Sequence, residues 1–290
     1  MGASVTQGTR IRVDALLVKR GLVDSRTQAA AAVLAGEVYV SGTRAAKPGQ
    51  LVTMDALVEV RSRRRRFVGR GGEKLDHALG LFQIAVAGGT AVDVGASTGG
   101  FTDCLLQHGA TRVVAIDVGT GQLDWRLRTD PRVVSLEKRD IRTTTVEDVG
   151  GAVDIVTIDV AFISLVKVLP AVMTLVRSHG DIVALVKPQF EVGPKLARRG
   201  VVRDVMVHRA VLSRVLEHAS AMGLVPIAAT YSPLAGPEGN LEFFVHLRRE
   251  GQPVAIDVEA VVAQAHAKVP RRGIRPRRAG DPSAAGTVVG

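Results

Sequence analysis

Four charged side chains from well-separated parts of the sequence have types and positions suited to acid–base chemistry. Asp159 and Lys187 each close an apolar segment that is typical of a buried strand, and Lys74 stands at the start of a predicted helix. Glu242 follows a loop over 236–241. Because the carboxyl ends of parallel strands meet at one edge of a sheet, we expect Asp159 and Lys187 to lie together. Burial or a neighbouring cation can lower the pKa of a lysine by several units, so a neutral amine could accept a proton.

A glycine-rich segment between a predicted strand (91–95) and a predicted helix (101–108) has the form of a ligand-binding turn. Its glycines are Gly95, Gly99 and Gly100. This spacing is neither the G-x-G-x-x-G pattern nor a phosphate loop ending in Gly-Lys-Ser/Thr, so neither NAD nor ATP is favoured. We expect cofactor contacts from one continuous run of residues, namely Asp93, Gly95, Ala96, Ser97, Thr98, Gly99, Gly100 and Phe101.

Two acidic residues end the neighbouring predicted strands. Asp117 closes a strand over 112–117, where a carboxylate can accept hydrogen bonds from both hydroxyls of a ribose. Asp140 follows a strand over 133–137 and could reach an adenine amino group. The turn and the two acids therefore place groups that suit ribose and adenine at one edge of the sheet.

The middle of the chain alternates apolar strands with helices, which indicates the α/β class and a mostly parallel sheet with helices on both faces. A loop too short for a crossover helix joins the last two strands, which we expect to be antiparallel. Helices are expected after the strand that ends at Asp159, through about 177, and over 206–222. Seven strands are expected, over 91–95, 112–117, 133–137, 155–159, 181–187, 224–231 and 241–247.

The positive charge of this 290-residue chain is concentrated at its two ends. The formal net charge is +10, with +7 in residues 1–66, −2 in 67–265 and +5 in 266–290. Such asymmetry indicates a polyanionic partner, held by the flanks of the chain. We predict four segments: a basic module over 1–62, a basic linker over 63–73, an α/β domain over 74–267 and a disordered basic tail over 268–290.

The basic module is predicted to be a small α+β unit, with helices over 13–20 and 25–34 and strands over 37–42 and 57–60. Its motifs, among them Arg12-Val13-Asp14 and Lys19-Arg20-Gly21-Leu22, resemble the S4 RNA-binding domain, in which the second helix and the following turn face RNA phosphates. Arginine suits phosphate because its planar fork donates two parallel hydrogen bonds. The resemblance and the adjoining arginine run imply RNA contacts from Arg10, Arg12, Arg20, Ser25, Arg26, Gln28, Lys47, Arg65 and Arg66.

The α/β domain resembles the S-adenosyl-L-methionine-binding domain of class I methyltransferases, and more narrowly the FtsJ-like ribose 2′-O-methyltransferases. Together with the N-terminal module, the chain resembles the TlyA (hemolysin A-like) family of ribosomal RNA methyltransferases. The resemblance implies a catalytic tetrad of Lys74, Asp159, Lys187 and Glu242, with Glu238 as a competitor for the last position. It is carried by the segments 70–75, 93–103, 159–165, 186–191 and 236–242.

This family implies methyl transfer from S-adenosylmethionine to a ribose 2′-oxygen, for which no metal is needed. Lys187 would act as base or alkoxide stabiliser with help from Lys74, and the two roles compete because a protonated lysine cannot accept a proton. Asp159 would orient Lys187, and Glu242 would hold Lys74 or the ribose. The resemblance further implies cytidine in the RNA of one or both ribosomal subunits. We expect a cytoplasmic monomer.

Composition excludes several other classes. A single cysteine, Cys104, excludes an internal disulfide and a four-cysteine metal site, and we expect it to be a small core residue, since no His/Cys cluster is evident. The sequence has neither a long uncharged apolar stretch nor a secretory signal. Two alternatives to the enzyme remain open: a hemolysin-like membrane-active protein, and a non-catalytic ribosome-binding factor.

Overall fold

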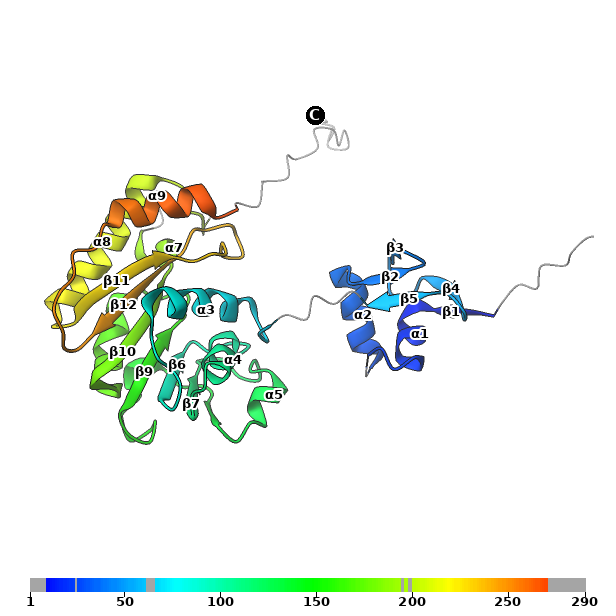
Figure 1. Cartoon of the computed structure of the whole chain (residues 1–290), viewed down its shortest axis with the longest axis horizontal. Coiled ribbons are helices and arrows are strands. Elements are labelled where there is room, and N and C mark those ends of the chain that lie inside the picture. The colour runs from blue at the N-terminus through cyan, green and yellow to red at the C-terminus, as the bar shows by residue number, and fades with distance from the viewer. Residues whose placement is uncertain (1–8, 24, 61–65, 194–195, 198–199, 271–290) are drawn as a thin grey trace, which may run out of the picture. The chain divides into compact units, whose positions relative to one another are not determined.

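The structure is a computed structural model that describes residues 9–23, 25–60, 66–193, 196–197 and 200–270. Two compact units, Met1–Arg66 and Phe67–Gly290, make up the chain (Figure 1). No helix in the described ranges is long and apolar enough to cross a membrane.

The N-terminal unit contains both helices and both strands that the sequence predicts, together with three short strands that it does not. Ser25 caps the second helix by accepting a hydrogen bond from the backbone N–H of Gln28 (3.2 Å), and Gly36 ends it in the left-handed conformation. Strand β1 pairs antiparallel with β4, while β3, β2 and β5 form a second small sheet. The elements are β1 Arg10–Arg12, α1 Val13–Lys19, α2 Arg26–Ala35, β2 Val38–Val40, β3 Thr43–Arg44, β4 Leu51–Thr53 and β5 Val58–Val60.

The second unit is built on a seven-stranded, mostly parallel sheet in the order β11-β12-β10-β9-β6-β7-β8, which confirms the predicted class. Strand β12 runs antiparallel to both of its neighbours, β10 and β11, as expected from the short connection between the last two strands. The strands are β6 Thr90–Val94, β7 Arg112–Ile116, β8 Val133–Leu136, β9 Val153–Ile158, β10 Val176–Val186, β11 Val225–Tyr231 and β12 Phe243–Arg248.

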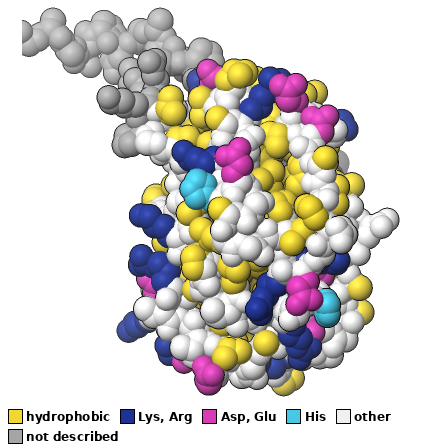
Figure 2. All heavy atoms as spheres, turned by 90° about the vertical axis from the view of Figure 1, so that its left-hand side faces the viewer, with side chains coloured by type: hydrophobic (Ala, Val, Ile, Leu, Met, Phe, Trp, Pro, Cys, Tyr) yellow, Lys and Arg dark blue, Asp and Glu magenta, His cyan; other side chains and the backbone are white. Residues whose placement is uncertain are grey.

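Helices cover both faces of this sheet (Figure 1). Alternate strand residues explain why the strands are apolar throughout: Val92 and Val94 pack into one buried cluster, and Ala91 packs into the other. Charged and apolar side chains are mixed over the side that carries α8 and β11 (Figure 2). The helices are α3 Arg70–Phe82, α4 Gly100–Gln107, α5 Trp125–Arg128, α6 Leu169–Leu175, α7 Pro188–Glu191, α8 Val205–Ala221 and α9 Val258–Lys268, with 3-10 turns η1 Ile141–Thr143 and η2 Leu165–Lys167.

The helices differ from the prediction in two places. The helix expected after β9 is interrupted, since η2 comes first and β10 already begins at Val176. Helix α9 was not predicted, because only Val262 and Ala265 of its residues are buried and its apolar pattern is weak. Since α9 extends to Lys268 and Val269 is buried, the predicted tail begins too early, and its remainder from 271 lies outside the described residues.

The predicted linker over 63–73 also extends too far. Phe67 is buried in the same apolar cluster as Leu75 and Phe101, and α3 already begins at Arg70. A Cβ on Gly72 would overlap the Phe67 ring, so the glycine allows the incoming chain to pack against the helix. Residues 67–73 therefore belong to the second unit, and the arginine run before them shifted the predicted boundary.

We predict that a fragment over 67–290 unfolds cooperatively in urea, whereas a fragment over 74–290 is less stable by about 3–5 kcal/mol, the usual cost of removing a buried aromatic side chain. Equilibrium urea unfolding of the two fragments measures the difference. The substitution Phe67→Ala in the full chain is the matched control and should lower the free energy of unfolding by a similar amount. Equal stability of the two fragments would contradict the boundary at Phe67.

Candidate active site

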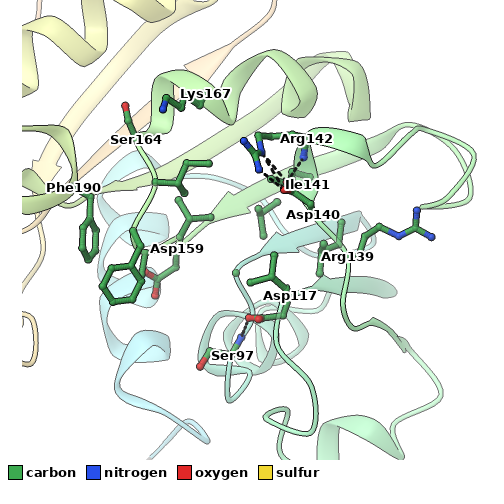
Figure 3. A pocket seen from close by; sticks show the side chains of 18 of the residues that line it. Ser97, Asp117, Arg139, Asp140, Ile141, Arg142, Asp159, Ser164, Lys167 and Phe190 are labelled. Carbon is green, nitrogen blue, oxygen red and sulfur yellow. Dashed lines mark hydrogen bonds and ion pairs between the residues drawn. The ribbon is translucent and has the colours of Figure 1, made fainter.

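The loops after β6, β7, β8, β9 and β10 surround a cavity of about 1010 Å³ at the carboxyl edge of the sheet (Figure 3). A smaller cavity of about 240 Å³ shares Gly95, Ser97, Asp159 and Ala161 with the first. Of the predicted cofactor residues, Gly95, Ser97, Asp117 and Asp140 line the larger cavity, and Ala96, Thr98, Gly100 and Phe101 line the smaller one.

Two ion pairs join the four proposed tetrad residues. Lys187 Nζ lies 2.6 Å from Asp159 Oδ1, and Lys74 Nζ lies 2.5 Å from Glu242 Oε2. Helix α3 carries Lys74, whereas the other three residues lie at the ends of β9, β10 and β12. Segments far apart in sequence therefore bring two lysines and two acids to one edge of the sheet.

The two pairs influence each other electrostatically. Burial raises the pKa of the Glu242 carboxyl, while the charges of Lys74 and Lys187 lower it and Asp159 raises it further. Glu242 is 2% exposed, whereas Glu238 is exposed in the loop before it. The geometry thus brings Glu242, and not its competitor, to Lys74.

Close backbone approach at glycines assembles this edge. A Cβ on Gly95, where φ is +82°, would lie 2.6 Å from the Asp159 carbonyl oxygen. A Cβ on Gly100 would lie 3.0 Å from the backbone nitrogen of Gly72, so α3 approaches the start of α4 closely. Side chains at these positions would therefore separate the turn from Asp159 and from the helix that carries Lys74.

Two residues of the predicted cofactor run lie behind the turn and line neither cavity. Gly99, with φ +93°, faces Leu123 and Leu127. Asp93 is 0% exposed, and its carboxylate accepts hydrogen bonds from the hydroxyls of Thr102 (2.7 Å) and Thr157 (3.1 Å). Asp93 thus supports the turn from within the sheet, and direct contact with a ligand in the cavity is not expected.

The two acids predicted at strand ends, Asp117 and Asp140, both line the larger cavity, but their hydrogen-bond partners differ. Asp117 accepts hydrogen bonds from the backbone N–H groups of Ser97 and Gly119, both at 2.7 Å, and so connects the turn to β7. Asp140 forms an ion pair with Arg142 at 2.6 Å, and hydrogen bonds from that guanidinium lower the pKa of Asp140 (Figure 3). An adenine amino group would have to share the Asp140 carboxylate with Arg142.

The sequence analysis gave no role to several cavity residues. Phe162 is 91% exposed at φ +63°, and its ring centroid lies 5.0 Å from that of Phe190. Its position three residues after Asp159 was the sequence feature that could have indicated a place at the cavity. Other lining residues without a predicted role are Val118, Gln122, Arg139, Arg142, Ser164, Lys167 and Gln189.

Three of the proposed RNA-contacting arginines, Arg12, Arg20 and Arg26, are exposed and have partners within the N-terminal unit. Asp14 is buried and holds Arg12 at 2.7 Å and Arg26 at 3.3 Å, and hydrogen bonds from Arg12 help to lower its pKa to about 2. Arg20 donates to two backbone carbonyls, those of Met54 and Ala56, both at 2.7 Å. Arg10, Gln28, Lys47 and Arg66 are exposed, Ser25 is half-buried, and Arg65 lies outside the described residues.

Within the described residues, the structure brings together one group of possible metal ligands that the sequence did not suggest. The donor atoms of Asp76, Cys104 and His108 lie within 4.8 Å of one another between α3 and α4. His108 Nε2 lies 2.7 Å from Asp76 Oδ1. Cys104 is buried in the core, as predicted, and Asp76 joins Cys104 and His108 from another helix, which the sequence alone does not show.

Asp93→Asn should flatten the dependence of stability on pH. Burial raises the pKa of Asp93 from 3.8 to about 7, against the Thr102 and Thr157 hydroxyls, which lower it. The neutral carboxyl therefore stabilises the folded state fully below about pH 4, and this contribution is lost as the pH rises through 7. In urea unfolding from pH 4.5 to 8, the free energy of unfolding of the variant should rise relative to that of the wild type by up to about 4 kcal/mol. Parallel stability curves would contradict this prediction.

Comparison with known proteins agrees with this geometry. Residues 67–249 match the FtsJ-like methyltransferase family, and residues 11–58 match the S4 domain. "16S/23S rRNA (cytidine-2′-O)-methyltransferase TlyA" of Mycobacterium tuberculosis is 49% identical over 243 residues, which cover 83% of this chain and 91% of that protein. "Putative rRNA methyltransferase YqxC" of Bacillus subtilis is 43% identical, covering 88% of this chain and 94% of that protein.

A solved structure, "Putative hemolysin from Streptococcus thermophilus", superposes with a TM-score of 0.71 at 42% identity, covering 89% of this chain and 96% of that one. The matches thus extend over both units and not over the sheet alone. This chain belongs to the TlyA family of FtsJ-like methyltransferases.

Proposed function

We propose that this enzyme transfers a methyl group from S-adenosylmethionine to the 2′-oxygen of a cytidine ribose in ribosomal RNA of the small subunit, the large subunit or both. The observation that carries the proposal is the pair of lysine–carboxylate contacts at the carboxyl edge of the sheet, one of which lines a cavity of about 240 Å³ that shares residues with the larger cavity of about 1010 Å³. The Mycobacterium tuberculosis relative, whose name states this reaction, supports the choice of substrate.

The residues around the two cavities suit S-adenosylmethionine. A Cβ on Gly71 would lie 3.2 Å from Phe101 and 3.8 Å from Asp159 Oδ2, so the missing side chain leaves room between them in the smaller cavity. Asp117 would hold the ribose and Asp140 the adenine, and the carboxylates near the cavities complement a cationic sulfonium. When bound, the cofactor supplies an electrophilic methyl group whose transfer needs no metal.

We assign the acceptance of the 2′-hydroxyl proton to Lys187. Lys187 and Asp159 both line the smaller cavity, whereas Lys74 and Glu242 line neither cavity. Asp159 orients the Lys187 amine, which has to be neutral when it accepts the proton. The Lys74–Glu242 pair is buried and lines neither cavity. From there the charge of Lys74 stabilises the negative charge that develops on the ribose 2′-oxygen. Orientation of the two reactants contributes most, up to about 7–11 kcal/mol in favourable models.

The N-terminal unit would hold the ribosomal RNA. Asp14 preorganises Arg12 and Arg26, whose forks would bind phosphates bidentately. One chain supplies all four tetrad residues, so the enzyme would act as a monomer. Its action on ribosomal RNA would place it in the cytoplasm.

Lys187→Ala should lower the rate of methyl transfer to ribosomal RNA by about 10²–10⁴-fold, the usual effect of losing a positioned base, while affinity for S-adenosylmethionine is retained. Single-turnover transfer of radiolabelled methyl and calorimetric titration of the cofactor measure the two effects. Full turnover by the variant would contradict the assignment, and a wild-type protein that binds no cofactor would favour a non-catalytic ribosome-binding factor.

Glu242→Gln and Glu238→Gln form a matched pair that tests the choice between the two glutamates. Glu242→Gln leaves Lys74 without its buried countercharge and should lower both turnover and stability, the latter by about 3–5 kcal/mol. Glu238→Gln changes an exposed side chain, so both should stay near the wild-type values. The reverse result would assign the role to Glu238.

Deletion of residues 1–66 should weaken RNA binding by at least tenfold at low salt and reduce its salt dependence, because most of the basic excess is removed. Cofactor affinity should not change, since the cavity residues all lie in the second unit. Filter binding to ribosomal RNA at several salt concentrations measures the effect. Unchanged RNA affinity would remove the module from the proposed function.

A further inference from the structure

Trp125, the single tryptophan of the chain, begins α5 and is 69% exposed. The fold does not use this side chain for its core, since Leu123 and Leu127 of the same segment are buried. A large aromatic side chain gains free energy from burial, so its exposure at an ordered position points to a binding role.

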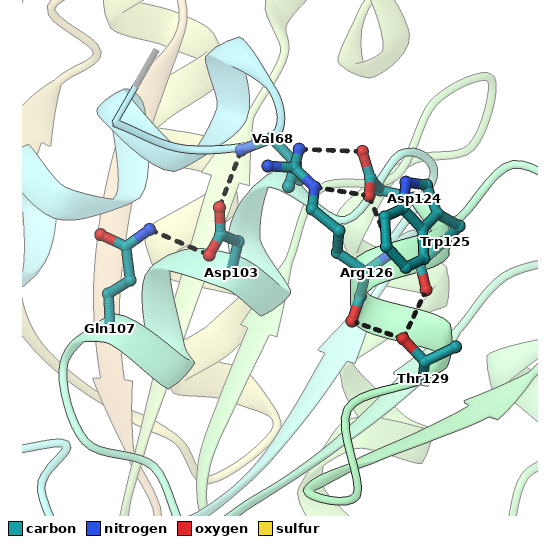
Figure 4. A network of polar contacts seen from close by, with 7 residues as sticks. All are labelled: Val68, Asp103, Gln107, Asp124, Trp125, Arg126 and Thr129. Atoms are coloured by element: carbon teal, nitrogen blue, oxygen red, sulfur yellow. Dashed lines mark hydrogen bonds and ion pairs between the residues drawn. The ribbon is translucent and has the colours of Figure 1, made fainter. Parts of the chain in front are cut away.

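The backbone beneath Trp125 is fixed. The Asp124 carboxylate caps α5 by accepting a hydrogen bond from the backbone N–H of Arg126, and the Thr129 hydroxyl donates to the Trp125 carbonyl at 3.1 Å (Figure 4). The backbone N–H of Asp124 donates to the carbonyl of Thr98 at 3.2 Å. The indole therefore stands on a platform that is hydrogen-bonded to the glycine turn of the active site.

Two arginines, Arg126 and Arg128, share the short helix α5 with Trp125. Arg126 forms an ion pair with Asp124 at 3.0 Å, and Arg128 forms one with Glu137, and all four side chains reach solvent. Exposed ion pairs contribute little free energy, so these guanidinium groups can exchange a carboxylate for a phosphate at small cost.

The chain enters the second unit beside this platform. The backbone N–H of Val68 donates to Asp103 Oδ2 at 2.7 Å (Figure 4). The hydrogen bonds that Arg126 donates to Asp124 raise the pKa of its guanidinium, and the charge of Asp103 raises it further. An exposed aromatic side chain that shares a short helix with two solvent-reaching arginines, next to the active-site turn, suits single-stranded nucleic acid, which can stack a base on the ring and place phosphates at the guanidinium groups.

We propose that Trp125, with Arg126 and Arg128, binds an unpaired nucleotide of the substrate RNA by stacking its base on the indole. The inference deepens the proposed function and rests on it. The contact is an additional binding point for the RNA on the second unit, made by residues that line neither cavity. Stacking on an aromatic face tolerates any base, so this contact positions the strand without selecting its sequence.

Because the chain has one tryptophan, its intrinsic fluorescence reports on this position alone. The full-length protein is titrated with a short single-stranded RNA of mixed sequence and with a duplex of the same sequence. We expect saturable quenching with the single strand and much less with the duplex. Equal quenching by the duplex, or none with either RNA, would overturn the proposal.

Substitutions provide the second arm, with RNA affinity measured by anisotropy of labelled RNA. Trp125→Ala should weaken binding of the single strand by about 5- to 150-fold, and Trp125→Phe, which keeps an aromatic face, should lose much less. Leu81→Ala removes another exposed apolar side chain, from the C-terminal turn of α3, and should have no effect. Wild-type affinity of Trp125→Ala would refute the stacking contact.

The same proteins are assayed for methylation of ribosomal RNA and for cofactor binding. Trp125→Ala should bind S-adenosylmethionine as the wild type does. Quenching by RNA without methylation by the wild type would remove the proposed function and leave the RNA surface standing. Methylation by the wild type, without quenching and without loss of RNA affinity in Trp125→Ala, would support the proposed function and overturn the stacking contact at Trp125.

Discussion

Lys74 and Glu242 form a buried ion pair, with 2.5 Å between Nζ and Oε2, and the rest of the active site depends on it. Two charges taken out of water are tolerated only as partners, so α3 and the start of β12 must keep their positions relative to each other. The pair lies beside Asp159 and Lys187, which act on the Glu242 carboxyl. A displacement of α3 would therefore change both the packing of the unit and the electrostatics at Lys187.

Glycines make that position of α3 possible. The backbones of α3 and α4 meet at Gly72 and Gly100, and the turn meets the β9 loop at Gly95. A Cβ at Gly95 or Gly100 would crowd these contacts, so both glycines allow segments of the chain to approach one another closely. Asp93 has the same character, because it supports the turn from a fully buried position instead of reaching into the cavity.

The sequence predicted the parts of this fold that depend on continuous local patterns. Buried strands such as β6 and β9 are apolar on both faces, and their carboxyl ends placed Asp159 beside the glycine turn. What depends on partners distant in sequence could not be predicted: the packing of Phe67 that moves the domain boundary, and the meeting of Asp76 with Cys104 and His108. The ion pair of Asp140 with Arg142 is local, but residue types alone do not show which partner a side chain takes. Phe162 lies in the segment 159–165, which carries the family resemblance, but its exposure and its backbone φ of +63° are seen only in the structure.

The distribution of charge and of exposed aromatics explains how a nearly neutral catalytic unit can act on RNA. Residues 67–265 carry a net charge of −2, so long-range attraction of a polyanion has to come from the ends of the chain. Attraction of that kind weakens with salt, whereas stacking on an aromatic ring does not depend on counterion release. Phe162 is exposed on the loop after β9, and Trp125 is exposed at the start of α5, which follows β7. The catalytic unit therefore offers RNA contacts that complement, and do not duplicate, the charge of the N-terminal unit.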